Sequence, residues 1–492
     1  MSHVDSLRAQ KMKKSIKKNY IFNVSYQIIN LLVPFIISPH ISRILKADGI
    51  GEVSYIESVV SYFVLFATLG VTTYGQREIS YVQDLLEKRT VIFWETKIIE
   101  VCSSAVAIVV YIFFLFRQEN KSLYIIFIFS LLAVLVDITW FFQGIEEFGK
   151  VVAKNILIKI FNIIFVYCFI RTQDDLILYA FGLTFFLFMG NLSLWRYLGK
   201  FITRVKLSQL HPFRNIKIII SLFVPTIAIQ IYTVLDKTMI GVITQDTFEN
   251  GYYEFAIKIC RMAITLVTAL GAVMIPRIGY HFEKKEIEIV KSLMYKSYRF
   301  IWFLGIPLCF GLIIVSKNFI PWFLGAGYEK VIILLGILSF LILAIGISNV
   351  TGMQYLLPTK REKIFTAAVI CGAIFNFILN LFLINVFQSI GAAIASVIAE
   401  IIVTSMQLYF VRREISCVRI LKEGRHYFIA VIFMMLVLVM ESFYLESSVV
   451  NTTIMVVSGA SVYFIVLTIL KDELWLSSVN SLLKLMRKRI SY

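Results

Sequence analysis

Apolar runs of about 20 residues recur along the whole chain, and they constrain its fold more than any other feature of the sequence. A run of that length, coiled as an α helix, crosses the roughly 30 Å hydrocarbon layer of a bilayer. The 492 residues are 59% hydrophobic and only 16% charged, with a mean hydropathy of +0.82. These values lie far from the averages of soluble domains. The sequence therefore predicts an all-α, polytopic membrane protein.

We place fourteen transmembrane helices on these runs. Their ranges are roughly 20–41, 51–75, 91–116, 122–143, 154–171, 175–196, 216–244, 253–277, 297–316, 331–354, 363–385, 390–411, 426–444 and 449–470. The loops between them are short, so neither side of the membrane has room for a soluble catalytic domain. We expect the activity of this protein to lie within the bilayer.

Two stretches of the sequence indicate an internal duplication. Gly51 opens the second predicted span and Leu69-Gly70 lies near its end, while Gly251 precedes the eighth span and Leu270-Gly271 lies near its end. This pattern predicts two pseudo-symmetric six-helix lobes followed by two extra helices. Transporters built from such halves commonly bind substrate between them, near the middle of the membrane.

The predicted domain organisation follows from the lobes and the flanking charge. It comprises a basic cytoplasmic tail (1–19), an N-lobe (20–200), a cytoplasmic linker (201–215), a C-lobe (216–411), two extra helices (412–470) and a cytoplasmic amphipathic tail (471–492). The amphipathic tail either lies on the inner leaflet or is a solvated tail.

The formal net charge of +17 agrees with this topology. Most of the 48 Lys and Arg residues fall in the two tails and in alternate loops, which is the positive-inside pattern. An even number of spans then places both termini in the cytoplasm, and the excess charge requires no nucleic-acid partner. The six cysteines and five histidines form no disulfide framework or metal-ligand cluster, and no GxxxxGK[ST] loop is present. We expect no cofactor.

The eighth span contains three charged residues on one helical face. Glu254, Lys258 and Arg261 stand at i, i+4 and i+7. An ionised side chain at bilayer depth costs roughly 2.5–3.5 kcal/mol, so such groups normally face a bundle interior or a wet cavity. The spacing therefore predicts that this helix lines a polar cavity.

The seventh span has a similar polar face. Gln230, Thr233 and Lys237 follow the spacing i, i+3 and i+7, and Asp236 precedes the lysine. This stripe is typical of a helix that lines a cavity. The alternative is that Asp236 and Glu254 only neutralise the neighbouring lysines as structural ion pairs.

The N-lobe has fewer charges at membrane depth. Asp137 and Lys159 are candidates for groups that face the cavity, although Lys159 can instead snorkel to the cytoplasmic surface. Trp140 is either a cavity residue or an interfacial belt residue. Lys97 and Glu100 lie in the first turns of the long third span, and we expect both near the interface.

The last two spans of the C-lobe carry features that favour helix packing. Asn376 and Asn380, one turn apart, can hydrogen-bond a neighbouring helix. The run GAAIASVIAE permits close approach of another helix through Gly391, Ala392 and Ala395.

Several motifs of the chain resemble those of one transporter family. They are ISRILKADGIGEVSY (41–55), WFFQGIEEF (140–148), LDKTMIG (235–241), GYYEFAIKI (251–259), GMQYLLPTKREK (352–363) and GAAIASVIAE (391–400). In this order and spacing they resemble bacterial polysaccharide flippases of the Wzx type, in the multidrug, oligosaccharidyl-lipid and polysaccharide exporter superfamily. The resemblance covers nearly the whole chain.

The resemblance implies a fold and a function. Members of this family have fourteen helices in two lobes around a central, often cationic, cavity. They move an undecaprenyl-pyrophosphate-linked oligosaccharide, an O-antigen or capsule repeat unit, from the inner to the outer leaflet of the bacterial cytoplasmic membrane by alternating access. They are not enzymes, and their partners are the lipid-linked substrate, membrane lipids and polysaccharide polymerase or assembly proteins.

The residues of this chain suit such a substrate. Cations can hold the diphosphate by charge-assisted hydrogen bonds, and the candidates are Lys237, Lys258, Arg261, Arg43 and Lys159. Polar side chains can meet the sugar hydroxyls, and the candidates are Gln230, Tyr232, Gln354 and Asn376. An H+ or Na+ gradient or the membrane potential is the expected driver. The candidate coupling carboxylates are Asp137, Asp236 and Glu254.

Three other functions compete with this hypothesis. A drug or organic-cation antiporter of the same superfamily is expected to have mainly acidic groups in its cavity, whereas cations at least balance carboxylates here. Lipid II transport requires the same chemistry as the flippase hypothesis. A membrane-embedded polysaccharide polymerase usually needs a large outer loop with catalytic residues, which the short outer loops do not provide.

Overall fold

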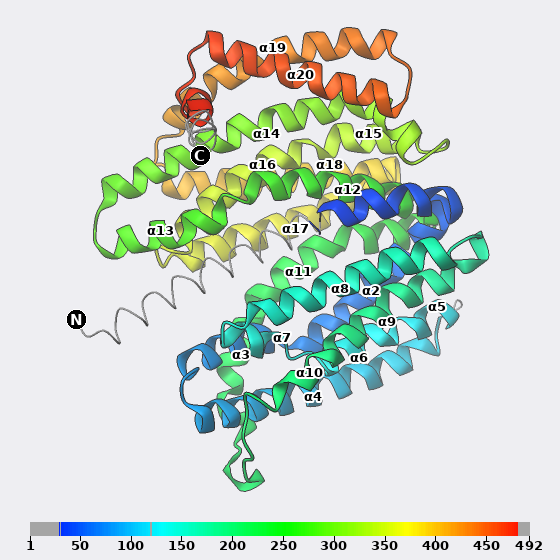
Figure 1. Ribbon diagram of the computed structural model, residues 1–492, viewed down its shortest axis with the longest axis vertical. Coiled ribbons are helices and arrows are strands. Elements are labelled where there is room, and N and C mark those ends of the chain that lie inside the picture. Colours follow the sequence, from blue (N-terminus) through cyan, green and yellow to red (C-terminus); the bar gives the residue numbers. More distant parts are fainter. Residues whose placement is uncertain (1–28, 30, 119–120, 481–492) are drawn as a thin grey trace, which may run out of the picture. The chain divides into compact units, whose positions relative to one another are not determined.

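The computed structural model describes residue 29, residues 31–118 and residues 121–480, and this part of the chain is helical without strands (Figure 1). Twelve of its helical segments are long and apolar enough to cross a membrane. The other two predicted spans correspond to the shorter apolar helix Leu31–Ile44 and to α11 (Ile216–Thr244). The predicted all-α fold of about fourteen membrane helices is confirmed.

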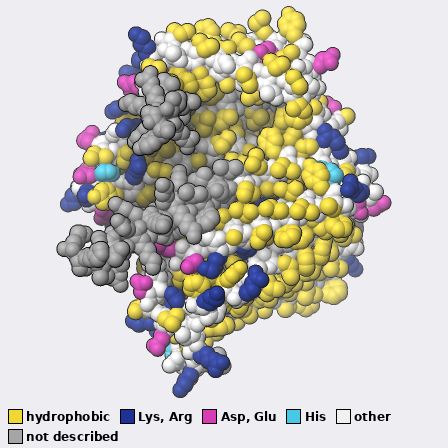
Figure 2. Space-filling view, viewed as in Figure 1, with side chains coloured by type: hydrophobic (Ala, Val, Ile, Leu, Met, Phe, Trp, Pro, Cys, Tyr) yellow, Lys and Arg dark blue, Asp and Glu magenta, His cyan; other side chains and the backbone are white. Residues whose placement is uncertain are grey.

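The surface of the molecule suits a lipid environment. Figure 2 shows hydrophobic side chains over much of the visible face, with Lys and Arg at its sides and in a group below its middle. Large apolar side chains along the spans, such as Val106, Phe382 and Val456, are exposed. In a membrane these exposed side chains contact lipid. The helices can lie in lipid because their backbone N–H and C=O groups hydrogen-bond within each helix.

The chain divides into two compact units, Met1–Thr238 and Met239–Tyr492. After Leu31–Ile44, the first unit contains α2 (Lys46–Thr68), α3 (Val71–Tyr81), α4 (Leu86–Leu115), α5 (Lys121–Ile126), α6 (Ile128–Leu135), α7 (Thr139–Gly144), α8 (Phe148–Phe169), η1 (Gln173–Asp175), α9 (Leu176–Ser193), α10 (Trp195–Leu198), η2 (Leu207–Gln209), η3 (Pro212–Asn215) and most of α11. The predicted linker 201–215 has only short 3-10 turns. The predicted domain boundaries stay predictions, and the tail 1–19 lies outside the described residues.

The second unit contains the remaining helices. They are α12 (Thr247–Thr268), α13 (Gly271–Glu283), α14 (Ile287–Phe323), α15 (Glu329–Leu338), α16 (Phe340–Ser348), the π-helical η4 (Asn349–Leu356), α17 (Glu362–Phe387), α18 (Ser389–Val411), α19 (Cys417–Tyr444) and α20 (Val449–Ile469). Short polar side chains cap several helix starts, because the first backbone N–H groups of a helix have no partner within it. Asp246 accepts from Phe248 N (2.9 Å) at α12, and Ser448 accepts from Asn451 N (3.0 Å) at α20.

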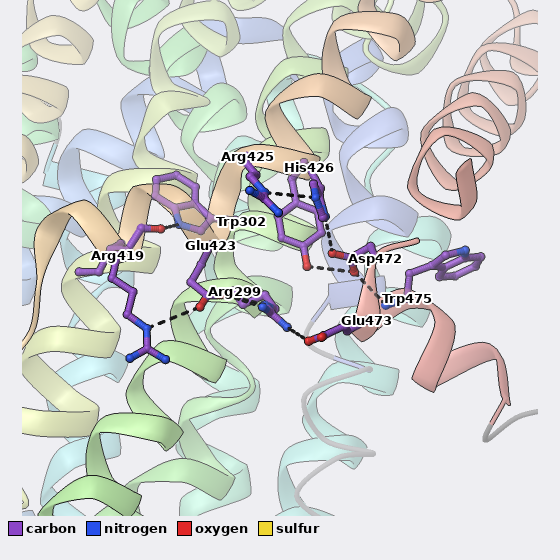
Figure 3. Close-up of polar contacts among 11 residues, drawn as sticks. Arg299, Trp302, Arg419, Glu423, Arg425, His426, Asp472, Glu473 and Trp475 are labelled. Carbon is purple, nitrogen blue, oxygen red and sulfur yellow. Dashed lines mark hydrogen bonds and ion pairs between the residues drawn. The ribbon is translucent and has the colours of Figure 1, made fainter. Parts of the chain in front are cut away.

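The two extra helices pack on α14 (Figure 1). Near their ends a polar network ties α19 and the segment after α20 to α14 (Figure 3). Arg299 of α14 donates to Glu423 (2.6 Å) and to Glu473 (3.0 Å). Asp472 accepts from Tyr427 Oη (3.1 Å) and from Trp475 N (3.0 Å), so it also caps the helical turn that follows. The described part of the predicted amphipathic tail is thereby fixed to the bundle, and residues 481–492 lie outside the described range.

Each unit has a helix interruption near the predicted duplicated position. In the first unit Leu69 and Gly70 separate α2 from α3, and both adopt left-handed φ values of 43° and 72°. In the second unit Ala269 and Leu270 separate α12 from α13 with right-handed backbone. The matching interruptions support the predicted pseudo-symmetry, although only the first uses left-handed geometry.

Small residues bring α17 and α18 together as predicted. Ala392 and Ala395 are fully buried. A Cβ added at Gly391 would lie 2.1 Å from the Leu383 carbonyl oxygen. Because that neighbour is backbone, the close approach at this position requires glycine.

The turn between η4 and α17 is held by an ion pair with the end of α18. Arg361 donates to both oxygens of Glu414, at 2.7 and 2.8 Å, and Tyr355 Oη also donates to this carboxylate. These hydrogen bonds, those of Arg361 above all, hold the pKa of Glu414 below its usual range. The loop therefore depends on an ionised carboxylate.

Replacing Gly391 by Ala should destabilise the protein, because the new methyl group meets a backbone carbonyl. We expect Gly391→Ala to lower the free energy of unfolding by about 1–3 kcal/mol, measured by SDS titration in mixed micelles. Gly336→Ala in α15 is the matched control, since nothing lies within 4 Å of its added Cβ. Equal stability of the two variants would contradict the packing described for Gly391.

Replacing Glu414 by Gln should have an effect that depends on pH. A lowered pKa means that the ion pair stabilises the fold above the unfolded-state pKa of about 4.3, and that this contribution disappears as the pH falls through the lower folded-state value. The pair is partly exposed, so we expect Glu414→Gln to cost about 1 kcal/mol or less at pH 7. Thermal unfolding in detergent at pH 7 and below pH 4 measures this difference, with Glu446→Gln as an exposed control. A cost that does not change with pH would contradict the role of the charge.

Candidate functional site

The fourth predicted span is interrupted inside the first unit. Instead of one helix over 122–143, the structure has α5, α6 and α7, with breaks at Phe127 and at Val136–Ile138. Three side chains from other helices donate to carbonyls near the second break: Asn191 to Ala133 (2.9 Å), Trp195 to Val136 (2.7 Å) and Lys97 to Asp137 (2.8 Å). These bonds make the break possible, because lipid cannot satisfy freed carbonyls.

A buried ion pair lies beside this break. Lys97 Nζ is 2.6 Å from Glu100 Oε2, and both residues are 2% or less exposed. Lys97 lies about 16 Å along α4 from its first residue. The prediction that Lys97 and Glu100 lie near the interface is wrong. The pair is enclosed within the bundle, where one ion is stable only because the other neutralises it.

Asp137 and Lys154 complete this buried polar cluster. The Asp137 carboxylate accepts from Thr139 N (2.8 Å), while Lys154 Nζ donates to Thr139 Oγ1 (3.0 Å) and Asn191 Oδ1 (2.8 Å). Lys154 is 7% exposed. Lys159, the predicted cavity residue of this helix, is half-buried. Lys154 of α8 therefore belongs to the cluster, and the cavity role of Lys159 stays a prediction.

Trp140 belongs to the aromatic core next to the break. It is fully buried and stacks on Phe93 with ring centroids 5.7 Å apart. A Cβ at Gly75 would lie 2.5 Å from its ring. The indole therefore packs against α3 and α4, and the structure supports neither the interfacial nor the cavity interpretation.

In the second unit, α12 presents the predicted charged face. Lys258 Nζ is 2.8 Å from Glu254 Oε1, and the Glu254 side chain is buried while that of Lys258 is 36% exposed. The structural ion pair considered from the sequence is thus present for these two residues. Arg261, one turn further on, is exposed.

Two predicted sugar-binding residues of the second unit are fully buried. Gln354 lies in the π-helical η4, a type of element frequent at functional sites, and donates to Asn349 Oδ1 (3.1 Å). Asn376 accepts from Asn380 Nδ2 (3.2 Å) within α17. In this conformation both amides serve the protein's own packing, and their substrate role stays a prediction.

The seventh span, α11, contacts α2 through Thr238. Tyr62 Oη is 3.1 Å from Thr238 Oγ1, which also donates to Ser58 Oγ at 2.9 Å. Asp236 is buried, whereas Lys237 and Gln230 are half-buried. The Tyr232 side chain lies outside what the structure describes.

The predicted cations belong to different parts of the chain. Lys237 lies in the first unit, and Lys258 and Arg261 lie in the second. Arg43 is exposed and donates to the Pro39 carbonyl at 2.5 Å. A joint diphosphate site of these cations stays a prediction. Within the described ranges, no group of three or more His, Cys, Asp or Glu side chains could hold a metal ion.

Comparison with known proteins identifies the family. Residues 16–282, more than half of the chain, match the family described as "Polysaccharide biosynthesis protein". The chain belongs to this family. One relative is the "Putative O-antigen transporter" of Escherichia coli (strain K12), which is 27% identical over 412 residues, covering 82% of this chain and 98% of the relative.

Solved structures share the fold of this polysaccharide biosynthesis protein. "Lipid II flippase MurJ, inward closed conformation" has a TM-score of 0.72 at 18% identity, covering 93% of this chain and 99% of that one. An inward-facing multidrug resistance MATE family transporter of the MOP superfamily has a TM-score of 0.58 at 14% identity, covering 81% and 99%. At these identities the likeness shows the fold alone.

Removing one member of the buried ion pair should be costly. Lys97→Met leaves Glu100 buried without its cation, so we expect a loss of about 3–5 kcal/mol in the free energy of unfolding. Lys97→Met/Glu100→Leu should recover most of this loss. Lys150→Met, which breaks the more exposed pair with Glu147, is the control and should cost about 1 kcal/mol or less. A double variant no more stable than Lys97→Met would contradict the pairing.

Proposed function

We propose that this protein is a flippase that moves an undecaprenyl-pyrophosphate-linked oligosaccharide, such as an O-antigen or capsule repeat unit, from the inner to the outer leaflet of the bacterial cytoplasmic membrane. The observation that carries the proposal is the exposure of Arg261. This residue lies about 21 Å along α12 from its first residue, well inside the span. Ionised groups at that depth normally face a bundle interior or a wet cavity, so the exposure of Arg261 favours a wet pathway along this helix.

The chemistry of the charged face on α12 supports a diphosphate rather than a cation as the ligand. Glu254 is buried and already paired with Lys258, so the more exposed side of the face is basic. A guanidinium can hold phosphate oxygens through two parallel hydrogen bonds. Lys237 and Arg43 are further candidates for this role.

Family membership agrees with this substrate class. The Escherichia coli relative carries the name of an O-antigen transporter, and the fold is that of a lipid II flippase and of multidrug transporters. The fold does not discriminate among these cargoes. The basic face on α12 favours the anionic lipid over an organic cation.

Transport proceeds by alternating access in this proposal, with both termini in the cytoplasm. The interruptions between α2 and α3 and between α12 and α13 are places where each unit can bend. A gradient of H+ or Na+ drives the transport cycle, and Asp137, Asp236 or Glu254 binds the coupling ion. A polysaccharide polymerase or other assembly protein then receives the exported unit.

Leaflet translocation in proteoliposomes tests the proposal. A fluorescent undecaprenyl-pyrophosphate oligosaccharide is followed by its accessibility to an external quencher, for wild type and for Arg261→Ala. We expect wild type to move the lipid and the variant to move it about tenfold more slowly or worse, the loss expected for a charge-assisted hydrogen bond. Lys422→Ala, on the exposed face of α19, is the matched control.

Lys258 needs a more careful design, because Lys258→Ala leaves Glu254 buried without its partner. The double variant Lys258→Ala/Glu254→Gln removes both charges and tests whether Lys258 also binds substrate. Lys237→Ala is measured alongside, at matched amounts of folded protein. If wild type moves no glycolipid but exchanges organic cations for protons or sodium, the flippase proposal is wrong and the antiporter alternative replaces it.

A further inference from the structure

An apolar groove of about 540 Å³ lies entirely within the first unit. Its walls come from α2, α4 and the start of α11, and include Phe63, Phe66, Ile99, Val106, Val110 and Phe213. The volume is in the range of ligand-binding pockets. Lys97, Glu100, Asp137 and Lys154 of the buried cluster are not among its lining residues.

The polar atoms that line this groove already have partners within the protein. Ser103 Oγ donates to the Ala67 carbonyl (2.6 Å) and to the Glu100 carbonyl (3.1 Å), and Tyr62 Oη is 3.1 Å from Thr238 Oγ1. The rest of the lining is hydrocarbon apart from the Cys102 thiol. A sugar or a phosphate would find few partners here, so the occupant must be apolar.

The shape of the groove fits an extended chain. Its lining residues on α4 run from Ile99 to Val110, about 16 Å along the helix, which is roughly half of the hydrocarbon thickness. Aromatic contacts stiffen one wall, since Phe63 packs on Tyr111 and Phe66 on Phe223, with centroids 5.1 and 6.1 Å apart. An apolar chain lying along these helices would fill this space.

Charge at one end of the groove matches an anionic lipid. Phe213 and Ile216 line the end where α11 begins, and the exposed cations Arg214 and Lys217 are their sequence neighbours. Glu95 accepts a hydrogen bond from His211 N in the same region, at 2.8 Å. This end of the groove therefore has two cations, Arg214 and Lys217, and one carboxylate near it. In the predicted orientation this end faces the cytoplasm, where an inner-leaflet lipid carries its phosphate.

We propose that the groove between α2 and α4 binds the first isoprene units of the transported lipid while its diphosphate lies at the inner surface near Arg214 and Lys217. This inference rests on the flippase function proposed above and adds a binding site for the lipid chain. The occupant is the polyisoprenyl chain rather than the acyl chain of a bulk phospholipid. The site holds the substrate before its head group reaches the cations of the transport pathway.

Native mass spectrometry of the full-length protein in detergent tests this site, with undecaprenyl pyrophosphate lacking sugar as the probe. Val106→Trp fills the groove and should lower the bound fraction at least tenfold. Val101→Trp is the matched control, because Val101 is also an exposed valine of α4 but lies on another face outside the groove. Thermal unfolding checks that both variants fold.

Each result has a defined meaning. Equal binding by both tryptophan variants overturns the site. Displacement of the probe by an equimolar amount of dioleoyl phosphatidylglycerol also overturns it, because the groove would then hold any acyl lipid. The translocation assay separates the two proposals: transport by wild type and undiminished transport by Val106→Trp contradict the groove alone, whereas no glycolipid transport by wild type contradicts the flippase function itself.

Discussion

The structure depends on one constraint, that polar groups at membrane depth must find their partners inside the protein. The interruption of the fourth span illustrates it, since Asn191, Trp195 and Lys97 supply the hydrogen bonds that water would otherwise give. Lys97 can serve this purpose only because Glu100 neutralises its charge. A broken helix therefore requires a buried ion pair, and the two features stabilise each other.

The same constraint separates structural charges from functional ones. Lys97, Glu100 and Lys154 of the first unit are buried and bonded within the protein, as expected of groups that hold a fold together. On α12, Glu254 and Lys258 also pair, but Lys258 is partly exposed and Arg261 is exposed. A charge that the fold leaves accessible within a span is costly unless it serves a ligand or a wet pathway. That contrast makes α12, rather than the buried cluster, the better candidate for contact with an anionic head group.

Apolar surface has two different roles in this protein. Most exposed hydrophobic side chains simply face lipid and require no further explanation. The groove between α2 and α4 differs because its polar atoms are internally bonded, aromatic pairs stiffen one wall, and cations lie beside one end. A lipid-linked sugar has three chemically distinct parts, and a flippase must accommodate each of them. An apolar groove and a basic helix face on separate helices are a physical way to do so.

The sequence by itself determined the spans, the duplicated Leu-Gly pattern of the second and eighth spans, and the close approach at Gly391, because each follows from local hydropathy, residue pattern or residue size. It also predicted the charged face of α12 from helical spacing. Only the tertiary structure decided that Lys154 enters the buried cluster, that Lys97 and Glu100 are enclosed, and that η4 is π-helical. These features depend on partners such as Asn191, which lies far from Lys154 in the chain. Hydropathy measures how apolar a segment is, but it does not indicate which distant side chain will contact that segment.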